Sequence, residues 1–228
     1  MVAEEPRGEG WIMSKGAILA NIRSSLAAAG DVPDSLPQRS AEWQDAGIDL
    51  PCGVSANEST VTLLIQRLED YDARVFAVEP GDAGSKIEEI LRTSGRKRIV
   101  VPPELSADWM RPGTEWVRDE SLSYSEIESC DGVLTAASVA VAESGSLVLQ
   151  HGPTEGRRAI TLLPDYHLCV VRRLQVVATL PECFARLKSE APSLITFISG
   201  PSATADIEMT RIKGVHGPRF LDVVLLND

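Results

Sequence analysis

Apolar residues near the start of the chain follow the period of a helix. Ile18, Ile22 and Leu26 recur every four residues, which places them on one helical face. Ser14 precedes them and has a side chain suited to an N-cap. The spacing therefore predicts an amphipathic helix over residues 14–29.

Two cycles of helix and strand are predicted next. The helical faces are Val61, Leu64, Ile65 and Leu68 in the first cycle and Ile87, Ile90 and Leu91 in the second, and the strands after them are 74–78 and 98–101. The second helix is expected to begin at Ser85, because Ser85 and Glu88 have the spacing of a capping box.

Later apolar runs are short and continuous, which is typical of strands covered on both faces. These runs are 133–134, 147–149, 168–171, 194–198 and 221–226, and helical segments are predicted between them at 125–130, 156–163, 181–190 and 204–213. Alternating helices and buried strands predict an α/β fold, specifically a three-layer α/β/α sandwich with a mainly parallel sheet.

Length and composition fit one globular domain behind an N-terminal extension. The chain has 228 residues, of which 43% are hydrophobic and 24% charged. Residues 1–13 are acidic and lack periodicity, which predicts a flexible tail. Residues 14–57 are expected to form the N-terminal helix and an irregular covering segment, and residues 58–228 the α/β domain.

Charge and hydropathy exclude several functional classes. A formal net charge of -11 argues against nucleic-acid binding, which depends on basic residues at phosphates. No apolar stretch approaches the roughly 18 to 20 residues that a membrane helix needs. Glu4, Glu5 and Glu9 stand where a secretory signal would be basic and then apolar. We therefore expect a cytoplasmic protein without a membrane span.

The sequence predicts no metal and no cofactor. Cys52, Cys130, Cys169 and Cys183 are scattered and form no CxxC pair, so ligand spacing for zinc or an iron–sulfur cluster is absent from the sequence. We expect reduced, mostly buried thiols. The chain also contains no P-loop, dinucleotide fingerprint, nucleophile elbow or HExxH motif.

Candidate chemistry is expected at the carboxyl ends of parallel strands, where ligands gather in such sheets. After the predicted strand 194–198 comes Ser-Gly-Pro-Ser, at 199–202, followed by the predicted helix. Its first amides could hold a carboxylate or phosphate, although the segment could equally be a capped helix and nothing more.

Two further segments carry reactive side chains. His216 lies among Arg211, Lys213 and Arg219 and could act as an acid or a base, or belong to a surface turn. Glu143 stands beside a Ser-Gly turn and could be a base, a nucleophile or a solvated carboxylate.

We also predict that 199–202 and 215–218 form two walls of one small-anion pocket, flanked by Glu143. This requires that the last strand is antiparallel or that the second loop folds back over the strand ends. Arg157 could pair with a carboxylate through two hydrogen bonds, or lie on a helix surface. His151 and His167 are expected to be surface or hydrogen-bonded structural residues.

Four segments occur in one order between residues 131 and 226. They are 143–149 (ESGSLVL), 156–158 (GRR) followed by 162–167 (LLPDYH), 200–208 (GPSATADIE) and 214–218 (GVHGP). Together they resemble the LUD domain family, and within it the lactate utilization protein C (LutC/YkgG-type) group. The resemblance implies a fold like that of the ribose-phosphate isomerase and CoA-transferase superfamily. It also implies a role in converting L-lactate to pyruvate beside partner proteins, at least one of which carries iron–sulfur clusters.

The candidate site residues come from these segments. For catalysis they are Glu143 and His216, and for ligand binding Gly145, Ser146, Arg157, Gly200, Ser202, Thr204, Asp206, Glu208 and Gly217. Ala203 stands where the family usually has an arginine, so Arg157, Arg211 or Arg219 would have to supply the positive charge.

Three functions are therefore open. The first is a subunit of a lactate-utilizing system with a pocket for a small organic acid or phosphate. The second is a stand-alone enzyme on a sugar phosphate or acyl-CoA, with Glu143 as base or nucleophile. The third is an assembly or regulatory protein.

Overall fold

A computed structural model describes residues 57–187, 194–205, 211–213 and 217–228, together with the single residues 20 and 24. The predicted tail, almost all of the N-terminal helix and the covering segment up to residue 56 lie outside the described residues.

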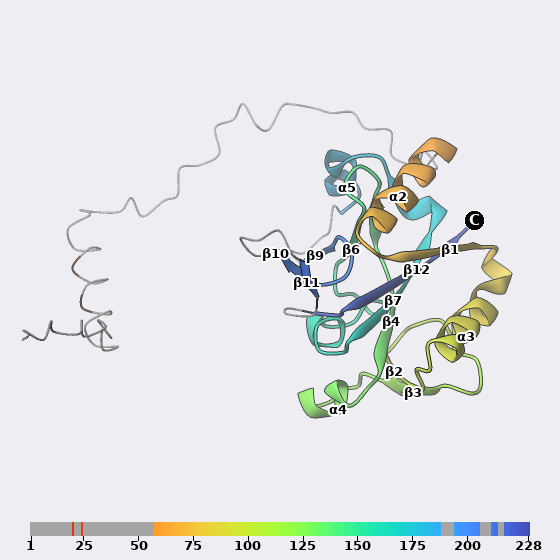
Figure 1. Ribbon diagram of the computed structural model, residues 1–228, viewed down its shortest axis with the longest axis vertical. Coiled ribbons are helices and arrows are strands. Elements are labelled where there is room, and N and C mark those ends of the chain that lie inside the picture. Colours follow the sequence, from red (N-terminus) through yellow and green to blue (C-terminus); the bar gives the residue numbers. More distant parts are fainter. Residues whose placement is uncertain (1–19, 21–23, 25–56, 188–193, 206–210, 214–216) are drawn as a thin grey trace, which may run out of the picture. The chain divides into compact units, whose positions relative to one another are not determined.

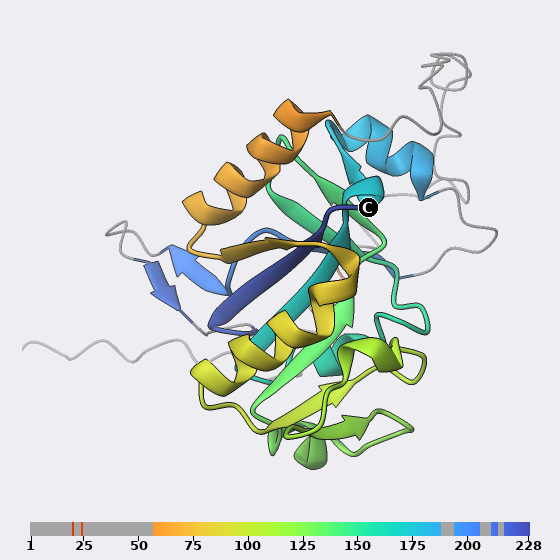
Figure 2. The ribbon, with the colours of Figure 1, turned by 90° about the vertical axis from the view of Figure 1, so that its right-hand side faces the viewer.

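The main sheet has six strands that all run in parallel (Figures 1 and 2). Its strands are β1 (Arg74–Val78), β2 (Arg98–Val101), β3 (Glu115–Arg118), β4 (Gly132–Ala136), β7 (Tyr166–Arg172) and β12 (Phe220–Leu226). The order across the sheet is β1-β12-β7-β4-β2-β3. The prediction of an α/β fold with a parallel sheet is confirmed, although β3 was not among the predicted strands.

A second, mixed sheet is a feature that the sequence did not predict. Its strands, in order, are β8 (Val176–Val177), β5 (Val139–Val141), β6 (Ser146–Leu149) and β9 (Thr196–Ile198). β6 pairs antiparallel with both β5 and β9, and β5 pairs parallel with β8. The apolar runs 147–149 and 194–198 therefore belong to this sheet and not to the main sheet. A continuous apolar run predicts a buried strand but does not specify which sheet the strand joins.

The helices are shorter or begin earlier than the sequence predicted. They are α2 (Glu58–Asp70), α3 (Ala83–Thr93), α4 (Tyr124–Glu128) and α5 (Leu180–Arg186), with 3-10 turns η2 (Pro80–Asp82), η3 (Ala107–Trp109), η4 (Arg158–Thr161) and η5 (Arg173–Gln175). α3 begins before Ser85, without a side-chain cap, because η2 leads directly into it. The helix predicted over 156–163 is only the turn η4.

The helix predicted over 204–213 is wrong. β10 (Ala203–Ala205) and β11 (Arg211–Lys213) form an antiparallel pair instead. The chain is already held by backbone pairing before it enters β10, because the amide of Ser202 donates to the carbonyl of Pro218 at 2.8 Å. Here tertiary pairing overrides the local helical signal.

The core is divided between the two faces of the main sheet. α3 packs on one face through Ile87 and Leu91. On the other face lie α2, through Leu64 and Leu68, and the second sheet. α5 covers the far side of the second sheet through Cys183. Figure 1 shows α2 and α3 on opposite sides of the strands.

Three of the four cysteines are buried free thiols, as predicted: Cys130, Cys169 and Cys183. Cys52 lies outside the described residues. Burial raises the pKa of the Cys169 thiol to about 12, so this thiol stays protonated. No helix in the described part of the chain is long and apolar enough to cross a bilayer.

Candidate functional site

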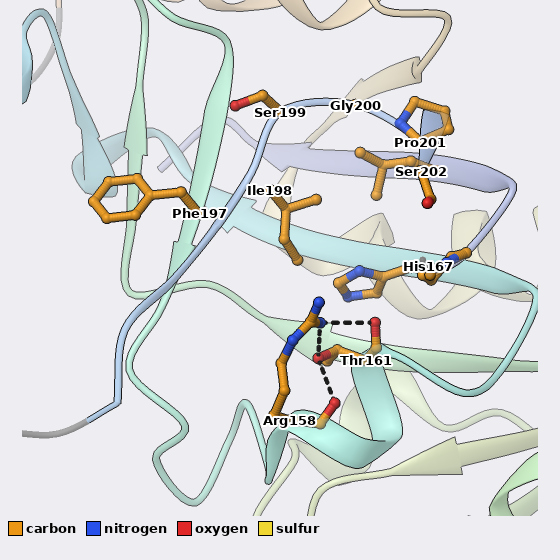
Figure 3. A pocket seen from close by; sticks show the side chains of 12 residues that line it. Arg158, Thr161, His167, Phe197, Ile198, Ser199, Gly200, Pro201 and Ser202 are labelled. Atoms are coloured by element: carbon orange, nitrogen blue, oxygen red, sulfur yellow. Dashed lines mark hydrogen bonds between the residues drawn. The ribbon is translucent and has the colours of Figure 1, made fainter. Parts of the chain in front are cut away.

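A cavity of about 240 Å³ lies where the second sheet meets the main sheet (Figure 3). Its walls come from η4, from the start of β7 and of β12, from residues 197–202 and from Gly217 and Pro218. His167 and Leu221 are the second residues of β7 and β12, so the cavity lies at the amino ends of these parallel strands. The expected location at the carboxyl ends of the main sheet is wrong for this cavity.

The two predicted walls lie side by side over the part that the structure describes. The Ser202 amide donates to the Pro218 carbonyl, and Gly217 lies against the Ser202 side chain. β12 is parallel to both of its neighbours, so the alternative of an antiparallel last strand is wrong. Segment 199–202 follows β9 of the second sheet, which places it near the start of β12. His216, Asp206 and Glu208 lie outside the described residues, and the Thr204 side chain is not described.

Arg158 brings a positive charge to the cavity (Figure 3). Its Nη1 donates to the carbonyl and the hydroxyl of Thr161, at 3.1 and 2.9 Å. No carboxylate among the described residues pairs with it. The side chain is partly buried, and this burial lowers the pKa of its guanidinium from the ordinary value of 12.5. Arg158 therefore carries a partly desolvated charge that an anion in the cavity would stabilise.

His167 faces the same cavity and is only 1% exposed. Its Nε2 lies 2.8 Å from the hydroxyl of Thr135, whereas its buried Nδ1 has no hydrogen-bond partner among the described residues. Burial, and then the nearby charge of Arg158, lower the pKa of His167 from 6.5 to about 3. The imidazole is therefore neutral near pH 7, and its Nδ1 makes no hydrogen bond within the described part of the chain.

The buried neutral state of His167 should make the protein sensitive to acid. The pKa of His167 is lower in the folded state than in the unfolded state. Its contribution to the free energy of unfolding is therefore complete above about pH 6.5 and is lost as the pH falls toward 3. Below pH 6.5 we expect the wild type to lose unfolding free energy relative to His167→Gln, by at most about 1.4 kcal/mol per pH unit. Urea denaturation at pH 7, 6 and 5 measures this, and carboxylates common to both chains cancel. A difference that stays constant with pH would contradict the prediction.

Arg157 does not serve the cavity. Its Nε and Nη2 donate to the two carboxylate oxygens of Asp119 at 2.7 and 2.9 Å, and Nη2 also donates to the carbonyl of Leu122. The bidentate pairing that the sequence suggested is thus made within the chain. Arg219 is likewise paired, with Asp165. Of the three arginines considered as substitutes at Ala203, two are therefore neutralised, and the side chain of Arg211 is not described.

Glu143 lies at the start of α5 and does not line the cavity. Its carboxylate accepts a hydrogen bond from the backbone amide of Leu180 at 2.9 Å, which stabilises the first turn of that helix. The turn that contains Glu143 reaches the cavity wall through Ser146, whose hydroxyl lies 2.6 Å from that of Ser199.

Gly145 and Gly200 both pack against the end of α2. They have positive φ angles of 58° and 83°. A Cβ on Gly145 would lie 2.7 Å from the Cβ of Arg67, and one on Gly200 would lie 2.5 Å from the Cβ of Tyr71. Close packing on α2 thus explains both glycines, and at Gly200 it fixes a turn that lines the cavity.

Sequence reasoning missed Arg158 and His167. The signal that could have found His167 is a polar residue inside the otherwise apolar run of β7, where every residue but the last is buried. No signal separates Arg158 from Arg157, because the two are adjacent and only the fold decides which one meets Asp119.

Comparisons with known proteins agree with this fold. The sequence profile of the LUD domain matches residues 61–226, a range that contains the whole cavity. Lactate utilization protein C of Deinococcus radiodurans is 37% identical over 208 residues, which cover 88% of this chain and 90% of that protein. Lactate utilization protein C of Bacillus subtilis is 29% identical over 244 residues, covering 96% and 99%. The crystal structure of a DUF162 family protein from Deinococcus radiodurans matches with a TM-score of 0.66 at 32% identity, over 74% of this chain and 97% of that chain.

Proposed function

Because this chain belongs to the LUD domain family, we propose that it is a subunit of a multi-protein L-lactate utilization system and binds a small organic acid beside Arg158. Its partners are then the iron–sulfur proteins of that system, which carry the electrons while this chain binds the acid in the cytoplasm. We further propose that its sheet belongs to the ribose-phosphate isomerase and CoA-transferase type of fold.

The observation that supports an acid ligand is the charge of Arg158, which pairs with no carboxylate in the part of the chain that the structure describes. Other arginines near the cavity, Arg157 and Arg219, have aspartate partners. Arg158 lines the cavity, and its partners among the described residues are the carbonyl and the hydroxyl of Thr161. A carboxylate would give it a charge-assisted, bidentate partner, which is among the stronger hydrogen-bond arrangements in proteins.

The size of the cavity favours a small acid. At about 240 Å³ it is below the roughly 300–1,000 Å³ of sites that hold drug-sized ligands. A sugar phosphate or an acyl-CoA is the alternative, and most of an acyl-CoA would have to lie outside the cavity. In that alternative Glu143 is the base or nucleophile, and its carboxylate would first have to break its hydrogen bond with the amide of Leu180.

Replacing Arg158 with methionine tests the acid site. We expect Arg158→Met to weaken binding of L-lactate or pyruvate by about 1.5–3 kcal/mol, the usual contribution of hydrogen bonds to a charged group. Isothermal titration calorimetry measures this, with acetate, ribose 5-phosphate and CoA as further probes. The matched control is Arg92→Met, an exposed arginine of α3 on the other face of the main sheet.

Equal loss of affinity in the control, or full affinity in Arg158→Met, would contradict the acid site. Binding of ribose 5-phosphate or CoA in preference to every small acid would favour the alternative enzyme. Co-purification with iron–sulfur proteins from a lactate-grown host tests the system separately from the cavity.

A further inference from the structure

One ring nitrogen of His167 is buried at the cavity, and its surroundings indicate whether it donates or accepts a hydrogen bond. His167 Nδ1 is buried and has no partner among the described residues, and it lies in the wall that Arg158 also forms. Figure 3 shows the imidazole and the guanidinium directed into the same space, below residues 198–202. A ligand that pairs its carboxylate with Arg158 therefore brings its neighbouring atoms to His167.

We propose that this cavity selects 2-hydroxy acids over 2-oxo acids, with the carboxylate on Arg158 and the 2-hydroxyl donating a hydrogen bond to Nδ1 of His167. This selectivity rests on the proposed function, in which the cavity holds a small organic acid. It adds the chemical class of that acid and the residue that distinguishes it.

The hydroxyl of Thr135 fixes which nitrogen of His167 carries the proton. It lies 2.8 Å from Nε2 and can donate its own proton to the sulfur of Cys169, 3.8 Å away. If Thr135 donates to Cys169, it accepts from Nε2–H, so the proton on Nε2 and the hydroxyl proton of Thr135 each have an acceptor. In the other tautomer Nδ1–H would be a buried donor without an acceptor among the described residues, which is the more costly kind of unsatisfied group.

Thr135 and Cys169 are both fully buried, so water does not compete for their hydrogen bonds. His167 therefore presents an acceptor at Nδ1.

An acceptor at this position distinguishes the two oxidation levels of the acid. The hydroxyl of a 2-hydroxy acid can donate to Nδ1, whereas the keto oxygen of a 2-oxo acid is itself an acceptor and leaves Nδ1 unpaired. Sites built around a substrate hydroxyl reject analogues that lack it, because buried polar groups then lose their partners.

The experiment titrates the full chain with L-lactate, pyruvate and propionate. These acids share the carboxylate and differ only at the second carbon. We expect L-lactate to bind about tenfold more tightly than the other two, which corresponds to one hydrogen bond. Thr135→Val should reduce this preference without changing the affinity for propionate, whereas the control Thr135→Ser keeps the hydroxyl and should keep the preference.

Nitrogen-15 NMR of the histidine side chains provides a readout that needs no ligand. The chain has three histidines, and His167→Gln assigns the signals of interest. We expect the Nε2–H tautomer in the wild type and in Thr135→Ser. The Nδ1–H tautomer in the wild type would overturn the inference, even if the Thr135 variants failed to fold.

The outcomes separate this inference from the proposed function. If none of the three acids binds, the proposed function fails and the selectivity fails with it. If all bind equally, or if pyruvate binds most tightly, the acid site stands and the selectivity is wrong. If Thr135→Val retains the full preference for L-lactate, the assignment through His167 is wrong.

Discussion

Replacing Arg74 with methionine is expected to lower the free energy of unfolding by about 3 kcal/mol, because it leaves a buried carboxylate without its cation. The carboxylate is that of Asp222, whose side chain is 2% exposed. It accepts hydrogen bonds from Nε and Nη2 of Arg74 at 2.7 and 2.5 Å, and from the hydroxyl of Tyr166 at 2.7 Å. Arg74 itself is 59% exposed, so solvent screens it and the lower end of the usual 3–5 kcal/mol range applies.

Thermal and urea denaturation measure this loss against a matched ion pair. Lys86 and Glu89 form an exposed pair on α3, so Lys86→Met should cost less than about 1 kcal/mol. The double variant Arg74→Met/Asp222→Asn should recover part of the loss, because a neutral amide can still accept from Tyr166. Equal losses for Arg74→Met and Lys86→Met would show that Asp222 does not depend on its arginine.

Gly145→Ala is expected to destabilise the protein by about 3 kcal/mol. Roughly 1 kcal/mol of this is the cost of a left-handed backbone for a residue with a Cβ. The remainder, roughly 2 kcal/mol, is the cost of overpacking, because the new Cβ would meet the Cβ and the carbonyl carbon of Arg67 at 2.7 and 2.9 Å.

Gly95→Ala separates these two costs. Gly95 also has a positive φ, of 72°, but no atom lies within 4 Å of the position that its Cβ would take. We therefore expect Gly95→Ala to lose only about 1 kcal/mol. Urea denaturation of the two variants gives the comparison. Similar losses at both positions would mean that α2 moves away from the turn at little cost.

The inner strands of the main sheet could be predicted from the sequence because they are buried on both faces. The runs at 98–101, 168–171 and 221–226 have no polar alternation, and all three became strands of this sheet. The second sheet could not be separated from it, since the run 147–149 of β6 is as continuously apolar as the runs of the main sheet, and β5 was not predicted as a strand. The Ser-Gly turn at 144–145 is the signal for this sheet, because it connects the antiparallel strands β5 and β6 as a hairpin.

The backbone segments of the candidate site were predicted from the sequence, whereas its charged and titratable side chains were not. Residues 199–202 and 217–218 were expected in one pocket, and they line the same cavity. The charged and titratable groups of that cavity were not predicted, because their roles depend on partners distant in sequence. Arg157 is neutralised by Asp119, which is 38 residues away, and His167 is oriented by Thr135, which is 32 residues away.

The position of β12 in the sheet has a consequence for synthesis on the ribosome. β12 lies between β1 and β7, and its residue Asp222 pairs with Arg74, which is 148 residues earlier. At roughly 5–20 residues per second, β1 waits about 7–30 s before its neighbour has been made. Until residues 220–226 have left the ribosome, the apolar strands β1 and β7 have exposed edges, which are sites for aggregation. The strand edge of β1 that pairs with β12 in the folded sheet therefore has no partner until the last strand has been made.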